Sequence, residues 1–156
     1  MKDKKLINLV LFQPEIPQNT GAIIRLCSCL SVPMEIIEPC GFIMGDKRIK
    51  RVAMDYKMKN EITRHKSWEA FYEKKRQSNK RLILFTTKVK KSFRDFNFIN
   101  EDLLLFGNES SGVPERVRDE VDESVTIPIA KDARSLNISM SVAIGVSEAM
   151  RQIEAK

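Results

Sequence analysis

The segment 14–25 carries residues whose types and spacing suit the binding of a negatively charged ligand. Its two prolines follow an apolar run, and a helical pattern starts directly after them, so Asn19, Thr20 and Gly21 are expected at the N-terminus of a helix. Unpaired backbone amides and the helix dipole favour anions at such a position. Arg25 lies one turn further along, aligned with Gly21 by the i, i+4 spacing. The pattern predicts a grip for a phosphate or a ribose, although an ordinary capped helix with a surface arginine has the same pattern.

A second polar segment, 106–114, leaves an apolar run and ends where a new helix can begin. Gly107 lies at the end of the run, where the missing side chain lets a ligand approach the backbone closely. Glu109 is the only acid in the segment and could pair with Arg25 or another cation. Pro114 suits the first turn of a helix. Two interpretations fit, a binding loop or a plain turn with a solvated glutamate.

A third polar segment, 127–139, leads into the last helical pattern with short hydrogen-bonding side chains, among them Ser135, Asn137 and Ser139. Such side chains suit an adenosine or ribose pocket, and they suit helix capping equally well. The helix that follows is rich in small residues, which allow close packing either within the fold or across a subunit interface. Gly145 would cost about 1 kcal/mol inside a helix, so we expect a packing reason for it.

Short apolar runs alternate with amphipathic stretches along the chain. The apolar runs predict strands at residues 6–12, 34–37, 81–86, 103–106 and 124–127. The amphipathic stretches predict helices at residues 20–30, 46–53, 67–77, 114–119 and 139–153. We therefore expect a single-domain α/β/α fold over residues 1–156, with a parallel sheet covered on both faces. Ligands of such sheets bind at the carboxyl ends of the strands, where the three polar segments lie.

Composition excludes several classes of protein. At 156 residues, with 42% hydrophobic and 31% charged residues, the chain is typical of one globular domain. It has no apolar run of membrane-spanning length and no signal-peptide pattern, so we expect a cytoplasmic protein without membrane contact. Cys27, Cys29 and Cys40 lack zinc-site spacing and are expected to be buried or half-buried free thiols. His65 is the only histidine, which argues against chemistry that needs a histidine base or a metal.

The net charge of +6 is concentrated in the middle of the chain. Residues 46–95 hold 17 Lys and Arg against 6 Asp and Glu, whereas the remainder holds 10 against 15. This asymmetry favours a polyanionic partner that touches one region, although lysine-rich surfaces also serve solubility.

Taken in order, the three polar segments resemble the three motifs of the SpoU-type ribose methyltransferases, a family of the SPOUT superfamily. The sequence between them is similar to that of the minimal, single-domain members, which methylate the 2′-OH of the wobble cytidine or uridine in leucine tRNAs. The matching stretches are 36–42, 46–48, 55–56, 63–65 and 86–88. The sequence departs from these members in the last helix, where they carry tyrosine and tryptophan at the positions of Ser147 and Met150.

The resemblance implies a deep trefoil knot at the C-terminal end of the fold, a homodimer, and S-adenosylmethionine as the cofactor without a metal. By the family's motifs, the cofactor-binding residues are Phe85, Gly107, Ile127 and Ser135. The catalytic set implied by the same motifs is Arg25, Asn19, Glu109, Ser135 and Asn137. In this scheme Arg25 lies at the 2′-OH, either as the base or as an electrostatic stabiliser of the developing alkoxide.

The partner implied by the resemblance is tRNA, held at its anticodon stem-loop. The expected phosphate contacts are Lys47, Arg48, Lys50, Arg51 and Lys88. Three alternatives remain open at this stage: methylation of another tRNA or rRNA site, a non-catalytic RNA-binding protein of the same fold, and a small-molecule nucleotide-binding enzyme.

Overall fold

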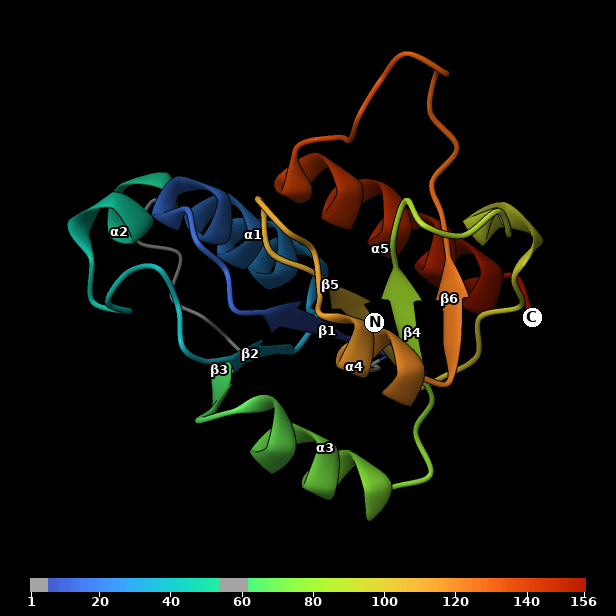
Figure 1. Ribbon diagram of the computed structural model, residues 1–156, viewed down its shortest axis with the longest axis horizontal. Coiled ribbons are helices and arrows are strands. Elements are labelled where there is room, and N and C mark those ends of the chain that lie inside the picture. The colour runs from blue at the N-terminus through green and yellow to red at the C-terminus, as the bar shows by residue number, and fades with distance from the viewer. Residues whose placement is uncertain (1–5, 54–61) are drawn as a thin grey trace.

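The computed structural model describes residues 6–53 and 62–156, and their strands form one twisted parallel sheet (Figure 1). The six strands lie in the order β3-β2-β1-β5-β4-β6. In chain order they are β1 (Ile7–Phe12), β2 (Met34–Ile37), β3 (Ile62–His65), β4 (Leu82–Phe85), β5 (Asp102–Phe106) and β6 (Glu123–Val125). Because β1 pairs with β5 as well as with β2, the loops that leave β1 and β5 emerge side by side, although they are far apart in the sequence.

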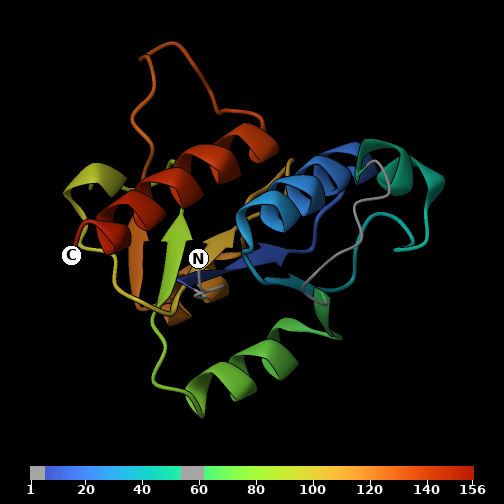
Figure 2. The same cartoon turned by 180° about the vertical axis from the view of Figure 1, so that it is seen from behind.

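Helices cover both faces of the sheet, as the two opposite views show (Figures 1 and 2). They are α1 (Pro17–Leu30), α2 (Lys47–Ala53), α3 (Trp68–Arg76), α4 (Glu115–Glu120) and α5 (Ile138–Glu154), with a short 3-10 helix, η1 (Phe93–Asp95). α1, α2, α5 and η1 contribute to the core on one face, and α3 and α4 contribute to the core on the other. The expected parallel α/β sheet with helices on both faces is confirmed.

The four inner strands supply both halves of the core, because successive side chains point to opposite faces. In β1, Leu9 and Leu11 pack on the side of α1 and α5, whereas Val10 and Phe12 pack on the side of α3. All residues of β4 and β5 are buried, as expected for inner strands of a parallel sheet. These buried strands form the rigid support from which the loops of the site project.

The apolar runs did not predict β3. Thr63 and Arg64 of this strand are exposed and only His65 is buried, so no apolar run marks it in the sequence. His65 Nε2 lies 2.8 Å from Glu35 Oε1 on β2, a polar contact that joins this edge strand to its neighbour. The family-like stretch 55–56 lies outside the described residues.

The expected free thiols are observed, but one of them is not buried. Cys27 is buried and Cys40 is half-buried, and burial raises the pKa of these thiols to about 12 and about 11. The prediction is wrong for Cys29, which is exposed, because residues two positions apart on a helix face different directions. Across residues 6–53 and 62–156, no helix is long and apolar enough to cross a membrane, and no group of three or more His, Cys, Asp or Glu could hold a metal ion.

Candidate active site

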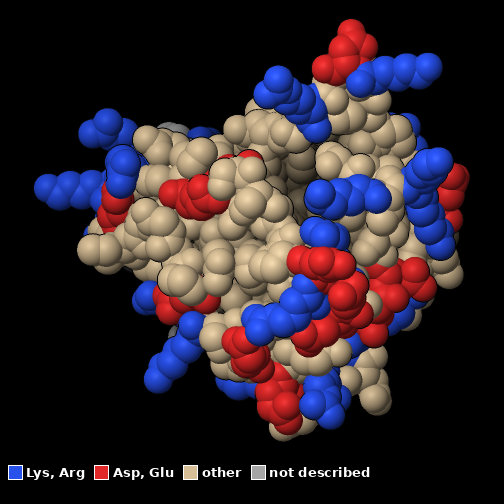
Figure 3. Space-filling view, viewed as in Figure 1, with Lys and Arg blue, Asp and Glu red and all other residues tan. Residues whose placement is uncertain are grey.

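A cavity of about 640 Å³ lies at the carboxyl ends of the strands, where the loops after β1, β4, β5 and β6 meet. Its volume is in the range of small-molecule sites. In Figure 3 the surface is hollowed near the centre of the view, with several Lys and Arg side chains to the right of the hollow. The three polar segments of the sequence therefore converge on one place, as the position of ligand sites in parallel sheets predicts.

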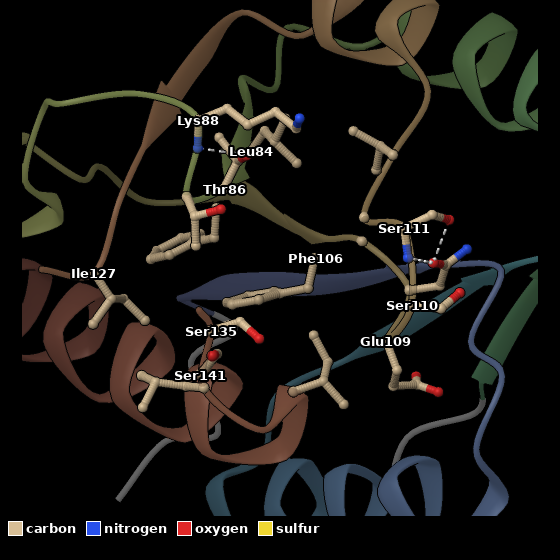
Figure 4. A pocket seen from close by; sticks show the side chains of 18 of the residues that line it. Leu84, Thr86, Lys88, Phe106, Glu109, Ser110, Ser111, Ile127, Ser135 and Ser141 are labelled. Carbon is tan, nitrogen blue, oxygen red and sulfur yellow. Dashed lines mark hydrogen bonds between the residues drawn. The ribbon is translucent and has the colours of Figure 1, made fainter. Parts of the chain in front are cut away.

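One wall of the cavity is apolar and is formed by Phe85, Phe106 and Ile127, the last two visible in Figure 4. The rings of Phe85 and Phe106 are stacked with their centroids 4.6 Å apart. Behind them lies Gly145 of α5, where an added Cβ would be 2.9 Å from Phe85 Cε1 and 3.1 Å from Phe106 Cζ. The expected packing reason for this glycine is confirmed, because only a missing side chain lets α5 support the ring pair directly.

The loop after β5 closes on itself through two glycines. A Cβ on Gly107 would lie 2.5 Å from the carbonyl carbon of Gly112, so this position has no room for a side chain. Asn108 and Gly112 exchange backbone hydrogen bonds of 3.0 and 3.1 Å, and Gly112 has a φ of +66°. Gly107 was expected to give a ligand access to the backbone. The structure shows that the turn itself also requires glycine here, because the backbone of Gly112 packs against this position.

The opposite wall is polar and is formed by Asn19, Glu109 and Ser110. Glu109 Oε2 accepts hydrogen bonds from the backbone N–H groups of Ile16 at 2.5 Å and Glu15 at 3.0 Å. The alternative of a solvated Glu109 is therefore wrong, because its carboxylate joins the loop after β5 to the loop after β1. Figure 4 shows Glu109 and Ser110 side by side on this wall.

Burial raises the pKa of the Glu109 carboxyl above its ordinary value. The amides of Ile16 and Glu15 lower this pKa by stabilising the carboxylate, and the negative charge of Glu15 raises it again. The net shift is upward, because desolvation outweighs the two hydrogen bonds.

The N-terminus of α5 is joined to α1 by two asparagines. Asn137 caps α5, since its Oδ1 accepts a hydrogen bond from the N–H of Ser139 at 2.9 Å. Its Nδ2 donates to Asn19 Oδ1 at 3.1 Å. One side chain of Asn137 therefore caps α5 and contacts Asn19, and Asn137 also lines the cavity.

The structure brings most of the expected site residues together. Those that line the cavity are Asn19, Phe85, Lys88, Gly107, Glu109, Ile127, Ser135 and Asn137. Of the expected catalytic set, Arg25 is exposed on α1 and is not among the described residues that line this cavity.

The other expected RNA contacts lie outside the cavity, on α2. Lys47, Arg48, Lys50 and Arg51 are exposed there, and Arg48 forms a two-pronged ion pair with Asp46 at 3.1 and 2.7 Å. That pair lowers the pKa of Asp46 to about 2, so Asp46 remains ionised and compensates the charge of Arg48.

Sequence reasoning missed two residues that shape the polar wall, Glu15 and Ser110. Ser110 Oγ donates a hydrogen bond to Glu15 Oε1, across two loops that are far apart in the sequence. The only signal for Glu15 was its place beside the prolines of segment 14–25, and nothing in the sequence related it to Ser110. Arg118 and Thr86 also line the cavity and were not expected there.

A family model described as the SpoU rRNA Methylase family matches residues 6–147. The chain belongs to this family. A family member from Beijerinckia indica, a tRNA (cytidine(34)-2′-O)-methyltransferase, is 44% identical over 147 residues, which cover 94% of this chain and 92% of that protein. The protein of the same name from Escherichia coli K12 is 39% identical over 150 residues, covering 95% of this chain and 94% of that protein.

Solved structures of SpoU-type enzymes have the same fold. One, from a study of the 2-OH methylation of C/U34 on tRNA, has a TM-score of 0.91 and 35% identity over 97% of this chain and 99% of that one. The SpoU methyltransferase AviRb from Streptomyces viridochromogenes, solved with AdoMet, has a TM-score of 0.83 and 25% identity over 97% of this chain and 59% of that one. The resemblance inferred from the motifs is confirmed, including its assignment to the tRNA 2′-O-methyltransferases known as TrmL.

Proposed function

We propose that this protein transfers a methyl group from S-adenosylmethionine to the ribose 2′-OH of nucleotide 34 of tRNA, a cytidine or a uridine. The observation that carries the proposal is the convergence of all three SpoU motif loops on one cavity, in a chain 44% identical to an enzyme named for this reaction. Leucine tRNAs, recognised at the anticodon stem-loop in the cytoplasm, are the substrates that the motif resemblance favours.

The cavity suits the proposed cofactor. Its apolar wall would hold the adenine, and Gly107 lines the same cavity with its backbone. Phe85, Gly107, Ile127 and Ser135 are the residues proposed to bind S-adenosylmethionine. When bound, this cofactor supplies an electrophilic methyl group on its sulfonium.

The chain's own residues would prepare the ribose hydroxyl. A 2′-OH is a weak acid, so its proton must leave as the oxygen attacks. Arg25 is proposed to act there, outside the walls of the cavity, as the base or as a stabiliser of the developing negative charge; an arginine side chain normally stays protonated, which favours the second role. The ribose that accepts the methyl group would be oriented by Asn19, Glu109 and Asn137. The cofactor would be oriented by Ser135.

We further propose that the C-terminal segment is threaded as the trefoil knot of the family. Two observations support this. The residue after β6, Thr126, exchanges backbone hydrogen bonds with Lys91 and Phe93 in the connection between β4 and β5. α5 then crosses the same connection, where Gln152 Oε1 accepts a hydrogen bond from the N–H of Phe98 at 2.9 Å. The connection is thus held on two sides by the chain that follows it.

A homodimer is proposed from the exposed face of α5. Met140 and Ile144, which are 61% and 38% exposed, stand one turn apart on this helix. An apolar stripe of this kind gains stability when a second copy covers it. The chain's mass in solution tests the proposal directly, and a Met140→Glu, Ile144→Glu variant should be monomeric if the stripe forms the interface.

The proposed RNA path runs from the cavity to α2. Lys88 lines the cavity, and Figure 4 shows its side chain extending over it. Lys47, Lys50 and Arg51 would contact phosphates further along the stem-loop, together with the compensated Arg48.

The test is methyl transfer from labelled S-adenosylmethionine into bulk tRNA and, separately, into rRNA, followed by nucleoside mapping. Label in a 2′-O-methyl pyrimidine at position 34 is expected for wild type, with a loss of about 100-fold or more for Arg25→Ala. Arg76→Ala, an exposed arginine of α3 on the opposite face of the sheet, is the matched control and should retain full activity. Label only in rRNA would assign another substrate, and no label despite cofactor binding would favour an RNA-binding role.

A further inference from the structure

Two glutamates bind each other's loops at the edge of the cavity. Glu109, after β5, accepts hydrogen bonds from the backbone amides of Glu15 and Ile16, after β1. In return, Glu15 Oε1 accepts the hydroxyl of Ser110 at 2.5 Å and its backbone amide at 3.4 Å. Each carboxylate therefore takes its donors from the other loop, and we call these four residues the clasp.

The backbone at Glu15 is held from a third side. Gly41, in the loop after β2, donates its N–H to Pro14 O at 2.9 Å, and a Cβ on Gly41 would lie 2.8 Å from Glu15 O. This contact fixes where the main chain of Glu15 runs. Its side chain remains the link to the loop after β5.

The clasp is not an obvious stabilising device. It keeps two carboxylates close together, and burial together with the charge of Glu15 raises the pKa of Glu109. A fold under selection for stability alone would place amides or hydroxyls here, because a desolvated carboxylate beside a like charge is costly. Electrostatic strain of this kind at the edge of a cavity is typical of functional sites.

The clasp controls one part of the site and leaves another part alone. The turn at Gly107 and Gly112 closes by its own backbone hydrogen bonds, so the proposed cofactor contacts there do not need the clasp. What the clasp fixes is the distance from Glu109 to Ile16 and Asn19 at the start of α1.

We propose that Glu15 is a positioning residue for methyl transfer: it touches neither ligand, and through Ser110 it holds the polar wall in register with α1. Glu15 itself does not line the cavity, whereas Ile16, Glu109 and Ser110 do. This inference rests on the proposed function. Its consequence is a separation of the two steps, in which loss of Glu15 slows methyl transfer and leaves cofactor binding intact.

The experiment measures three quantities on the full chain: the Kd of S-adenosylmethionine by calorimetry, kcat with tRNA, and amide hydrogen exchange at residues 108–112. For Glu15→Ala we expect a fall in kcat of about tenfold or more, a cofactor Kd within about twofold of wild type, and faster exchange at Ser110. Glu15→Gln keeps an oxygen that can accept the Ser110 donors, so it should recover most of kcat and of the protection. Glu73→Ala on α3, exposed on the opposite face of the sheet, is the matched control.

Each other outcome overturns the proposal in an identifiable way. If the cofactor Kd rises as much as kcat falls, Glu15 merely supports the whole site. If Ser110→Ala added to Glu15→Ala lowers kcat by the full product of the single effects, the two residues do not act together. If exchange at Ser110 is unchanged, the clasp does not hold the loop. A wild-type protein that binds the cofactor and methylates no RNA would instead refute the proposed function, while the exchange data would still decide whether the clasp exists.

Discussion

The apolar wall of the cavity is held in place by close packing, whereas the polar wall is held by hydrogen bonds between loops. Phe85 and Phe106 stack on each other and rest on Gly145, so their positions follow from close packing against α5. Glu109 and Ser110 are held by hydrogen bonds to a loop that lies elsewhere in the sequence. The residues of the apolar wall also pack in the hydrophobic core. The hydrogen bonds of the polar wall join only the loops that surround the site.

This difference predicts how the two walls respond to change. A substitution that disturbs the apolar wall should lower both stability and cofactor affinity, because the same rings serve the core and the cavity. A substitution in the polar wall should lower methyl transfer with little loss of stability, since the sheet beneath it stays intact. Three substitutions at the cavity test this contrast, and two on α2 extend it to a surface outside both walls.

The largest effect is expected for Gly107→Ala. The new Cβ would lie 2.5, 2.6 and 2.8 Å from the carbonyl carbon, Cα and oxygen of Gly112, all backbone atoms that cannot rotate away. The turn must open, so cofactor binding by calorimetry should fall by about 100-fold and methyl transfer should disappear with it. Gly45→Ala, where no atom lies within 4 Å of the added Cβ, is the control and should behave as wild type. Unchanged cofactor affinity in Gly107→Ala would exclude this turn from the cofactor site.

Gly145→Ala tests whether the apolar wall is shared with the core. Alanine gains about 1 kcal/mol of helix propensity, but its Cβ would lie 2.9 Å from Phe85 and overpacking of this kind costs about 1–3 kcal/mol. We expect a net loss in the free energy of unfolding by chemical denaturation, and a cofactor affinity a few-fold weaker because the ring pair shifts into the cavity. Lys74→Ala, an exposed position on α3, changes helix propensity alone and should lose no stability. A more stable Gly145→Ala would mean that the rings have room to move.

Most of the fold followed from the periodicity of the sequence. The runs at β4 and β5 are apolar throughout and predicted buried parallel strands, whereas β3 was missed because Thr63 and Arg64 face solvent at the sheet edge. Strand order is the part that periodicity cannot supply. The pairing of β1 with β5 depends on which long-range packing is most stable, and the trefoil knot, still a proposal, runs against the usual rules of chain topology.

The site, like the fold, was predictable in part from the sequence. Residues that end strands, such as Gly107 and Ile127, were expected at one edge of the sheet and are found there, because the rule for parallel sheets needs no knowledge of strand order. The clasp was not predictable, because Glu15 and Ser110 meet only if β1 lies beside β5. The extent of the cavity wall was equally hidden, which is why Arg25 was expected closer to it than it lies.

Glu109→Gln separates stability from activity in the polar wall. The raised pKa means that folded Glu109 holds its proton to a higher pH than in the unfolded chain. The stability contributed by this protonation is complete below the unfolded pKa, near 4.5, and is lost as the pH rises through the higher folded pKa. The variant, which has no charge to desolvate, should therefore become more stable relative to wild type as the pH rises from about 4 to neutrality, measured by thermal denaturation.

The same variant should be the slower enzyme. A carboxylate accepts amide hydrogen bonds more strongly than a carboxamide, so Glu109→Gln should hold Ile16 and Glu15 less firmly and lower kcat by several-fold at neutral pH. Its activity should also lose the decline at acid pH that protonation of Glu109 causes in wild type. A wild-type and a variant profile that superimpose would remove Glu109 from the transfer step.

The smallest effect is expected far from both walls, on α2, where the contrast is between a compensated and an uncompensated charge. Arg48 is paired with Asp46, whereas the exposed Lys50 of the same helix has no ion pair within 4.0 Å among the described residues. Removing a cation that contacts a phosphate lowers the slope of log affinity against log salt by about 1 and leaves the chemical step unchanged. Lys50→Ala should therefore raise KM for tRNA about threefold at constant kcat, and Arg48→Ala should raise it less, because the Arg48 guanidinium already uses donors on Asp46 and contributes less to a phosphate contact. Lys74→Ala, exposed on α3 on the opposite face of the sheet, is the control. Equal effects of the three variants would mean that the RNA responds to net charge alone, and that α2 is not a docking surface.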